Sequence, residues 1–338
     1  MNPERATPTL PMLFGRVVVP LLLAVGCSGQ TLDAGSDTPH GLLPIDERNP
    51  VILNNDNYDD NWQGVYAVLF SNAGGPSLAG IIVNASTYAP DITKNLAAWK
   101  GLTTAAQASR MRNIPDPIPS QGAPLARPSD GNIDSTLSNG SAGALLIVKE
   151  SARQYLPYRP LVVVTGGRLT DVADAYLIDK TVAERVVVVS ALGSITSTGA
   201  IMGPSNGELD PWADWIVTQR FRYVQVSAYY DQMTDITPTQ LSSLPQNALG
   251  DFIANQQPII EGILPRADHV SMIAVGLPKF VVTVERVALD PAGAFDAAIG
   301  PALVPDAKGH VWLVTGIDGA LATARLWQML QDPKTFGE

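Results

Sequence analysis

The sequence has little of three things whose scarcity excludes whole classes of protein. It has one cysteine, Cys27, among 338 residues, so no disulfide framework can stabilise the chain. It has 22 Lys and Arg against 32 Asp and Glu, a formal net charge of −10, with no cluster of basic residues. Nucleic acid is therefore not an expected partner, because phosphate binding needs a basic surface. After residue 26, no apolar run is long enough to span a bilayer.

The N-terminal segment has the pattern of a secretion signal. Positive charge at Arg5 and Arg16 is followed by a short apolar stretch, Val17 to Val25. This pattern is typical of a signal peptide, here residues 1–26. The small residues directly before Cys27 resemble a bacterial lipobox. We therefore expect Cys27 to be lipidated and to hold the protein in the bacterial cell envelope, outside the cytoplasm. The alternative is an ordinary signal peptide with an incidental cysteine.

The rest of the chain divides into a linker and a domain. Residues 27–50 are rich in Gly, Ser, Asp, Pro and Thr, which predicts a flexible tether. Residues 51–338 suit one large α/β domain, or one domain with an insertion. Continuous Val- and Ile-rich runs separated by helical patterns predict a mostly parallel, doubly wound sheet with helices on both faces. The predicted strands cover 51–54, 78–84, 161–165, 185–191, 223–228, 280–287 and 311–315, and the predicted helices cover 63–71, 92–106, 140–154, 170–178, 211–221, 267–276 and 319–331.

A group of acidic residues directly follows the first predicted strand. Asp56, Asp59 and Asp60 fall within five positions, where three carboxylates repel one another. A bound Ca²⁺ ion would offset that repulsion, because Ca²⁺ prefers carboxylate and carbonyl oxygens. Ligands also bind at this edge of open α/β sheets. The alternative is a solvated turn rich in Asp and Asn.

A second candidate feature follows the predicted strand 161–165. Gly166 and Gly167 come next, and a helix is expected to begin near Thr170. The glycines allow a close approach of the backbone, so the Thr165 carbonyl could face the site. The alternative is a tight strand-to-helix turn capped by Thr170.

Three later segments continue the pattern. The strand near Val186 ends in a Gly-Ser pair, the segment Asn206 to Ala213 contains Asp-Pro, and Asp268 stands ten residues before Pro278. These motifs and the two earlier ones resemble the inosine-uridine nucleoside hydrolase family in order and approximate spacing. The resemblance covers most of residues 51–280.

No motif of that family is intact in this chain. The family's opening loop, Asp-x-Asp-Pro-Gly-x-Asp-Asp, is one residue shorter here and has Asn57-Tyr58 in place of the Pro-Gly section. The family's middle turn, Gly-Gly/Pro-Leu-Thr-Asn-x-Ala, has Arg168 added or substituted and Asp171 in place of Asn.

The resemblance implies a Ca²⁺-dependent hydrolase of N-glycosidic bonds in ribonucleosides or related ribosides. It implies a metal site made by Asp56, Asp60, Asp268 and the Thr165 carbonyl, and sugar contacts from Asp59, Asn84, Ser86 and Asn206. Asp56 would also accept a proton from a water that the cation makes more acidic. That water would attack an anomeric carbon through an oxocarbenium-like transition state.

Two departures concern the sugar and the leaving group. The family Glu that holds the sugar has no counterpart in register, since Glu208 lies close but displaced. The family His stands directly before the last Asp, whereas here Ala267 precedes Asp268 and His269 follows it. His269 is therefore the candidate catalytic acid. Other candidates for that role are Arg266, Tyr229 and Tyr230.

Two further functions stay open beside the nucleoside hydrolase. One is a glycan-directed hydrolase on the same scaffold, suggested by the altered leaving-group residues. The other is a non-catalytic sugar-binding lipoprotein that retains the fold. Each of these functions has a small riboside or sugar as ligand. The expected link to the membrane is the lipid on Cys27, and a homo-oligomer is possible.

Overall fold

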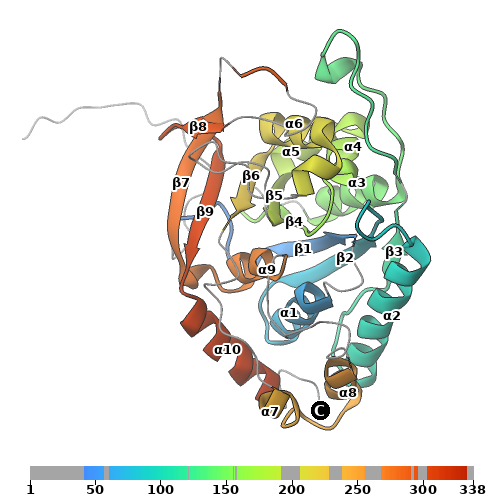
Figure 1. Ribbon diagram of the computed structural model, residues 1–338, viewed down its shortest axis with the longest axis vertical. Helices are drawn as coiled ribbons and strands as arrows, with labels where there is room; N and C mark the ends of the chain where they lie inside the picture. The colour runs from blue at the N-terminus through green and yellow to red at the C-terminus, as the bar shows by residue number, and fades with distance from the viewer. Residues whose placement is uncertain are drawn as a thin grey trace, which may run out of the picture. The chain divides into compact units, whose positions relative to one another are not determined.

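A mixed β-sheet lies at the centre of the described part of the chain (Figure 1). The computed structural model describes residues 42–56, 61–120, 122–154, 156, 158–191, 206–227, 238–255, 268–290, 293–295 and 303–332. Within these residues, nine strands form one sheet in the order β3-β2-β1-β4-β5-β6-β9-β7-β8. In this order, each strand from β3 to β9 is parallel to its neighbour, and β7 is antiparallel to both β9 and β8.

The strands are short and mostly apolar. They are β1 (Pro50–Asn55), β2 (Ser77–Val83), β3 (Pro117–Pro119), β4 (Leu161–Thr165), β5 (Val186–Ala191), β6 (Arg222–Val226), β7 (Val281–Leu289), β8 (Leu303–Pro305) and β9 (Val311–Ile317). Every residue of β1, β4 and β5 is buried, as expected for parallel strands covered on both faces. The structure confirms the predicted α/β class.

Helices cover both faces of the sheet (Figure 1). One core contains the side chains of Val51 and Leu53, and the helices that pack there are α1 (Asn61–Asn72), α2 (Ile92–Ala108), α8 (Ala248–Asn255), α9 (His269–Gly276) and α10 (Gly319–Gln331). The other core contains Ile52, and its helices are α3 (Ala142–Gln154), α4 (Thr170–Ile178) and α6 (Pro211–Arg220). The remaining helical elements are α5 (Val182–Arg185), α7 (Pro238–Leu241), η1 (Ile133–Ser135), η2 (Asn206–Leu209) and η4 (Pro278–Phe280).

The alternation along β1 explains the two cores. Successive side chains of a strand point to opposite faces, so Val51 and Leu53 enter one core and Ile52 the other. Each of these side chains is fully buried, and each such burial contributes about 1.5–3 kcal/mol of hydrophobic free energy.

The end of the segment 27–50, which the sequence predicts to be a tether, is packed. Leu43 and Ile45 are buried in the core that also contains Val51 and Leu53. The Asn49 side chain donates a hydrogen bond to the Pro160 carbonyl oxygen at 2.7 Å. The packed part of the chain therefore begins by Leu43, within the segment predicted to be a tether.

The connection between α2 and α3 is fastened to α4 and α6 by three buried carboxylates, Asp171, Asp174 and Asp210, which we call the loop-fastening aspartates. Asp171 accepts hydrogen bonds from the hydroxyls of Ser120 at 2.6 Å and Ser141 at 2.7 Å. Asp174 accepts from the Ser138 hydroxyl at 2.6 Å, and from the backbone N–H groups of Asn139 and Ser141, both at 2.8 Å. Asp210 accepts from the Thr170 hydroxyl at 2.6 Å, and from the backbone N–H groups of Leu125 at 2.9 Å and Ala213 at 3.1 Å.

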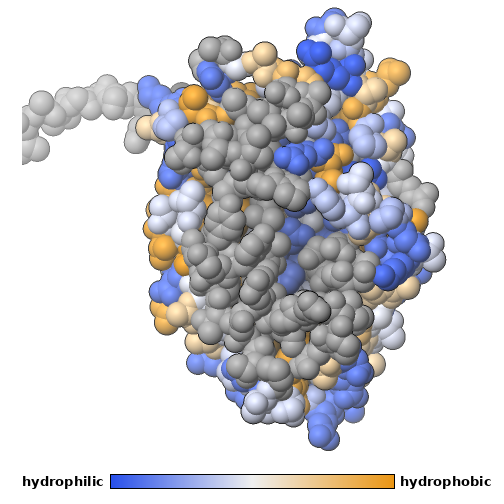
Figure 2. Space-filling model, in the orientation of Figure 1, coloured by the Kyte–Doolittle hydropathy of each residue, from blue (hydrophilic) through white to orange (hydrophobic). Residues whose placement is uncertain are grey.

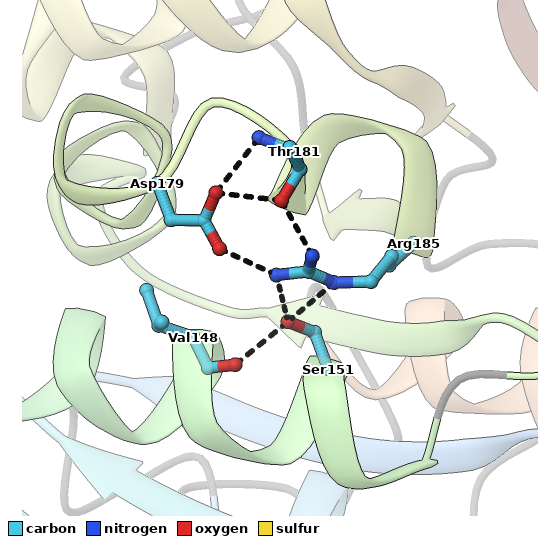
Figure 3. Close-up of polar contacts among 5 residues, drawn as sticks. All are labelled: Val148, Ser151, Asp179, Thr181 and Arg185. Carbon is cyan, nitrogen blue, oxygen red and sulfur yellow. Dashed lines mark hydrogen bonds and ion pairs between the residues drawn. The ribbon is translucent and has the colours of Figure 1, made fainter.

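A second polar group, which we call the arginine cluster, joins α3 to the turn between α4 and β5 (Figure 3). The Arg185 guanidinium donates to the Asp179 carboxylate at 2.7 Å and to the hydroxyls of Thr181 and Ser151. Asp179 also accepts from the Thr181 hydroxyl at 2.6 Å and its backbone N–H at 3.0 Å. These bonds lower the pKa of Asp179, with the Thr181 hydroxyl first and the arginine second. The cluster lies where β5 begins, at the edge opposite to the strand ends discussed below.

The described surface on the face shown in Figure 2 carries hydrophilic and hydrophobic residues interspersed with one another. None of the helices in the described ranges combines the length and the hydropathy needed to cross a bilayer.

Candidate active site

The predicted site lies along the edge where the parallel strands end. Register pairs Asn54 of β1 with Thr165 of β4, and Thr165 with Ser190 of β5. On the other side, Asn55 pairs with Val83 of β2. Residues that directly follow these strands therefore lie beside one another, and ligands of open α/β sheets bind at this edge.

Asp56 is the first residue after β1 and is 5 % exposed. Burial is the main influence on its pKa and raises it, while a hydrogen bond with Ser86 and the positive charge of Arg168 lower it. The buried carboxylate oxygen Oδ2 has no hydrogen-bond partner. Such an oxygen costs free energy unless a ligand satisfies it, so Asp56 is prepared to bind a cation or to accept a proton.

Asp268 directly precedes α9 and is also 5 % exposed. We call Asp56 and Asp268 the edge aspartates. Both pack against the glycine pair that follows β4: a Cβ on Gly166 would lie 2.9 Å from Asp268 Cγ, and one on Gly167 would lie 2.8 Å from Asp56 Cγ. Only glycine leaves this space, so the two glycines bring together carboxylates separated by about two hundred residues of sequence.

Thr165 ends β4 immediately before the glycines and is fully buried. Its hydroxyl has no hydrogen-bond partner, so a second buried oxygen at this point lacks a bond. The possible metal ligands here are the oxygen atoms of Thr165 and of the edge aspartates. Oxygen atoms of this kind are the ligands that Ca²⁺ prefers. The described residues therefore fit a divalent cation in chemistry. They do not contain a group of three or more His, Cys, Asp or Glu side chains arranged to hold a metal. Asp59 and Asp60 lie outside the described residues, as does Cys27.

The predicted sugar contacts that the structure describes are Asn84, Ser86 and Asn206. Asn84, directly after β2, donates to Asn54 Oδ1 at 2.6 Å, and its own Oδ1 is buried without a partner. The Ser86 hydroxyl is bonded to Asp56 and accepts from the backbone N–H of Tyr88 at 3.2 Å. Asn206, at the start of η2, donates to Asp268 Oδ1 at 3.2 Å. The Asn95 side chain donates to the backbone carbonyls of both Asp56 and Asn84, so Asn84 and Ser86 lie near Asp56, and Asn206 lies beside Asp268.

His269 is the first residue of α9 and is 3 % exposed. Its ring packs edge-on against Tyr66 of α1, with the ring centroids 6.1 Å apart. Burial lowers the pKa of His269 to about 3, so the imidazole is neutral at pH 7. Its Nδ1 atom has no hydrogen-bond partner. A neutral, enclosed imidazole is a weak proton donor, so these features favour a packing role over the predicted role as acid.

The sequence did not reveal two parts of this site. Gln63 of α1 accepts from Asn55 at 3.1 Å and donates to the Asp268 carbonyl oxygen at 3.2 Å and the Ser271 hydroxyl at 3.0 Å. This bridge ties β1, α1 and α9 together. A glutamine within the mostly apolar stretch from Trp62 to Phe70 was the only available signal. The other part is Arg168, whose charge acts on Asp56.

The same fold occurs in solved nucleoside hydrolases. An inosine-uridine preferring nucleoside hydrolase from Bacillus anthracis is 14 % identical over 85 % of this chain and 99 % of its own, with a TM-score of 0.60. A purine-preferring ribonucleoside hydrolase from Gardnerella vaginalis is 13 % identical over 85 % of this chain and 100 % of its own, with a TM-score of 0.56. An inosine-guanosine nucleoside hydrolase is 17 % identical over 83 % and 98 %, with a TM-score of 0.58. This chain has the nucleoside hydrolase fold. Comparison with family models and with curated proteins gives no match.

Proposed function

We propose that the protein hydrolyses N-glycosidic bonds of ribonucleosides or related ribosides and depends on Ca²⁺. The observation that supports this most directly is the buried, unpartnered Oδ2 of Asp56 next to Asp268, at the strand-end edge of a nucleoside hydrolase fold. A buried carboxylate oxygen without a hydrogen bond destabilises the fold, and such an oxygen is more typical of a ligand-binding site than of a structural core.

The proposed roles of the residues are those that the resemblance to nucleoside hydrolases implies. Asp56, Asp60, Asp268 and the Thr165 carbonyl would hold Ca²⁺, which would supply positive charge that acidifies water and attracts vicinal hydroxyls. Asp56 would accept the proton of the attacking water, since its carboxylate lies at the strand-end edge with an unbonded oxygen. The sugar hydroxyls are held by Asp59, Asn84, Ser86 and Asn206. The roles of all these residues are predictions, and the enclosure of His269 argues against its predicted role as acid.

Hydrolysis of a panel of substrates tests the proposal. The purified protein is incubated with purine and pyrimidine ribonucleosides and with p-nitrophenyl riboside, with Ca²⁺ and again with a chelator. We expect release of base or p-nitrophenol that stops when the chelator removes the metal. Turnover of p-nitrophenyl riboside alone would show sugar chemistry without assistance to the leaving group. Binding of sugar without any turnover would instead support the sugar-binding lipoprotein.

We also propose that Cys27 carries a lipid anchor in the cell envelope. The proposal rests on the apolar segment and the small residues before the cysteine. The variant Cys27→Ser should leave the membrane fraction when the cells are fractionated, because no acyl chain can be attached. Unchanged membrane association of the variant would reject the lipid anchor.

A further inference from the structure

Arg168 is a buried cation beside the proposed metal site. It lies two residues before α4 and directly follows Gly167, where a Cβ would lie 2.8 Å from Asp56 Cγ, so its backbone adjoins the residue that packs on Asp56. The residue is 9 % exposed, and its Nε atom is buried without a hydrogen-bond partner. Arginine is rarely buried unless a carboxylate pairs with it, because burying an unpaired charge costs free energy.

The charge of Arg168 acts on two carboxylates, which differ in how fully their oxygens are hydrogen-bonded. Its charge lowers the pKa of both Asp56 and Asp210, against the larger opposing effect of burial. Asp210 already accepts three hydrogen bonds, from Thr170, Leu125 and Ala213. Asp56 still has an unbonded oxygen. Among the described residues, Arg168 forms no ion pair with a nitrogen–oxygen distance within 4 Å, so its charge compensates both carboxylates from further away.

We infer that Arg168 is a positioning residue that supplies permanent positive charge at Asp56 and thereby weakens the binding of a divalent cation there. The inference rests on the proposed function only in placing the cation at Asp56. Like charges repel strongly where water is excluded, so a cation entering beside Asp56 meets the guanidinium as a competitor. The site then holds its cation more weakly than its carboxylates alone would, and the charge at Asp56 is partly compensated when the cation is absent.

Calorimetric titration with CaCl₂ at pH 7 and fixed ionic strength tests the inference on the full chain. Arg168→Gln should bind Ca²⁺ at least about tenfold more tightly than the wild type, because the competing charge is removed. Arg168→Lys keeps the charge and should bind within about threefold of the wild type. The control is Arg153→Gln, which removes a charge from the last turn of α3, near the opposite edge of the sheet.

Several outcomes would overturn the inference. Arg168→Gln could bind Ca²⁺ no more tightly than the wild type, or not at all. Arg168→Lys could match Arg168→Gln, which would show that shape rather than charge matters. If circular dichroism shows that Arg168→Gln does not fold, Arg168→Met, which retains an apolar stem, is titrated with the same expectation. A tightened Ca²⁺ affinity in a protein that hydrolyses no riboside would reject the proposed function and leave this inference standing.

Discussion

The loop-fastening aspartates and the edge aspartates are buried to almost the same extent but differ in what satisfies their oxygens. Asp174 and Asp210 are at most 1 % exposed, and hydroxyl or backbone N–H groups bond both oxygens of each. Asp56 is 5 % exposed and has one oxygen with no bond. Burial alone therefore does not distinguish a structural carboxylate from a functional one, but the supply of donors does.

The difference follows from where the local sequence provides donors. The stretch from Ser138 to Ser141 gives Asp174 three donors, the Ser138 hydroxyl and the backbone N–H groups of Asn139 and Ser141. At the end of β1, Asp56 packs against Gly167, which has no side chain, and among the described residues the Ser86 hydroxyl is the one side-chain group bonded to its carboxylate. The first aspartate therefore fastens a loop, while the second is left open to a ligand.

Asp56→Asn should produce the largest effect on activity. We expect hydrolysis to fall by at least about 10²-fold, because an amide cannot accept the proton and binds Ca²⁺ weakly. The free energy of unfolding without metal should stay the same or increase, since a buried charge is removed. Initial rates and urea unfolding measure the two effects. Full activity in this variant would remove the hydrolase mechanism and place Asp56 with the structural carboxylates.

Asp174→Ala should have the opposite effects, with lower stability and unchanged activity. The change leaves the Ser138 hydroxyl and two backbone N–H groups without their acceptor, which should lower the free energy of unfolding by about 3 kcal/mol. Activity per folded molecule should persist at low temperature. The matched control is Asp130→Ala in the same connection, whose exposed carboxylate should matter little. Equal unfolding curves for the two variants would show that Asp174 does not fasten the loop.

His269→Ala separates a packing role from the predicted role as acid. Because the imidazole is enclosed against Tyr66, we expect the variant to slow nucleosides and p-nitrophenyl riboside to a similar degree, within about threefold of each other. Tyr66→Phe keeps the aromatic ring and should leave both rates unchanged. A loss confined to nucleosides would restore the acid role, since p-nitrophenol leaves without a donated proton.

Much of the fold could be predicted because its local signals agree with the tertiary structure. The strand at Leu161–Thr165 and the helices at Thr170–Ile178 and Gly319–Gln331 have the predicted bounds, since apolar runs and helix-forming runs meet there at clear boundaries. The edge strands β3 and β8 were missed. Each has three residues and contains proline, so pairing with a neighbour rather than propensity forms them. The helix α8 was missed for a related reason, because its place against α2 comes from contacts distant in sequence.

The site could be predicted only in part. The order of motifs placed Asp56, Gly166 and Asp268 at one edge, because parallel strands end together. The bonds of Gln63 to Asp268, 205 positions away, and the charge of Arg168 on Asp56 depend on packing that no local pattern encodes. The enclosure of His269 also comes from tertiary contact with α1.

Asp179→Asn should have the smallest effect on the free energy of unfolding. It changes a carboxylate whose oxygens are both hydrogen-bonded, in the arginine cluster. The folded-state pKa of Asp179 lies below its ordinary value of 3.8. The charged form therefore adds stability above that value, and the gain is lost as the pH falls through the folded-state pKa. A third of the side chain is exposed, so screening limits the expected loss at pH 7 to about 1 kcal/mol.

Urea unfolding of wild type and Asp179→Asn between pH 2 and pH 7, roughly the range over which the carboxylate titrates, measures this loss. The two proteins should differ at pH 7 and converge at the acid end. Asp116→Asn is the control, because its exposed carboxylate accepts a single bond of 3.3 Å from Gln107. A difference that persists at low pH would mean that Asp179 acts through packing instead of charge. The number of hydrogen-bond donors around a carboxylate would then not explain its structural role. The difference between Asp56 and the structural carboxylates would need another cause.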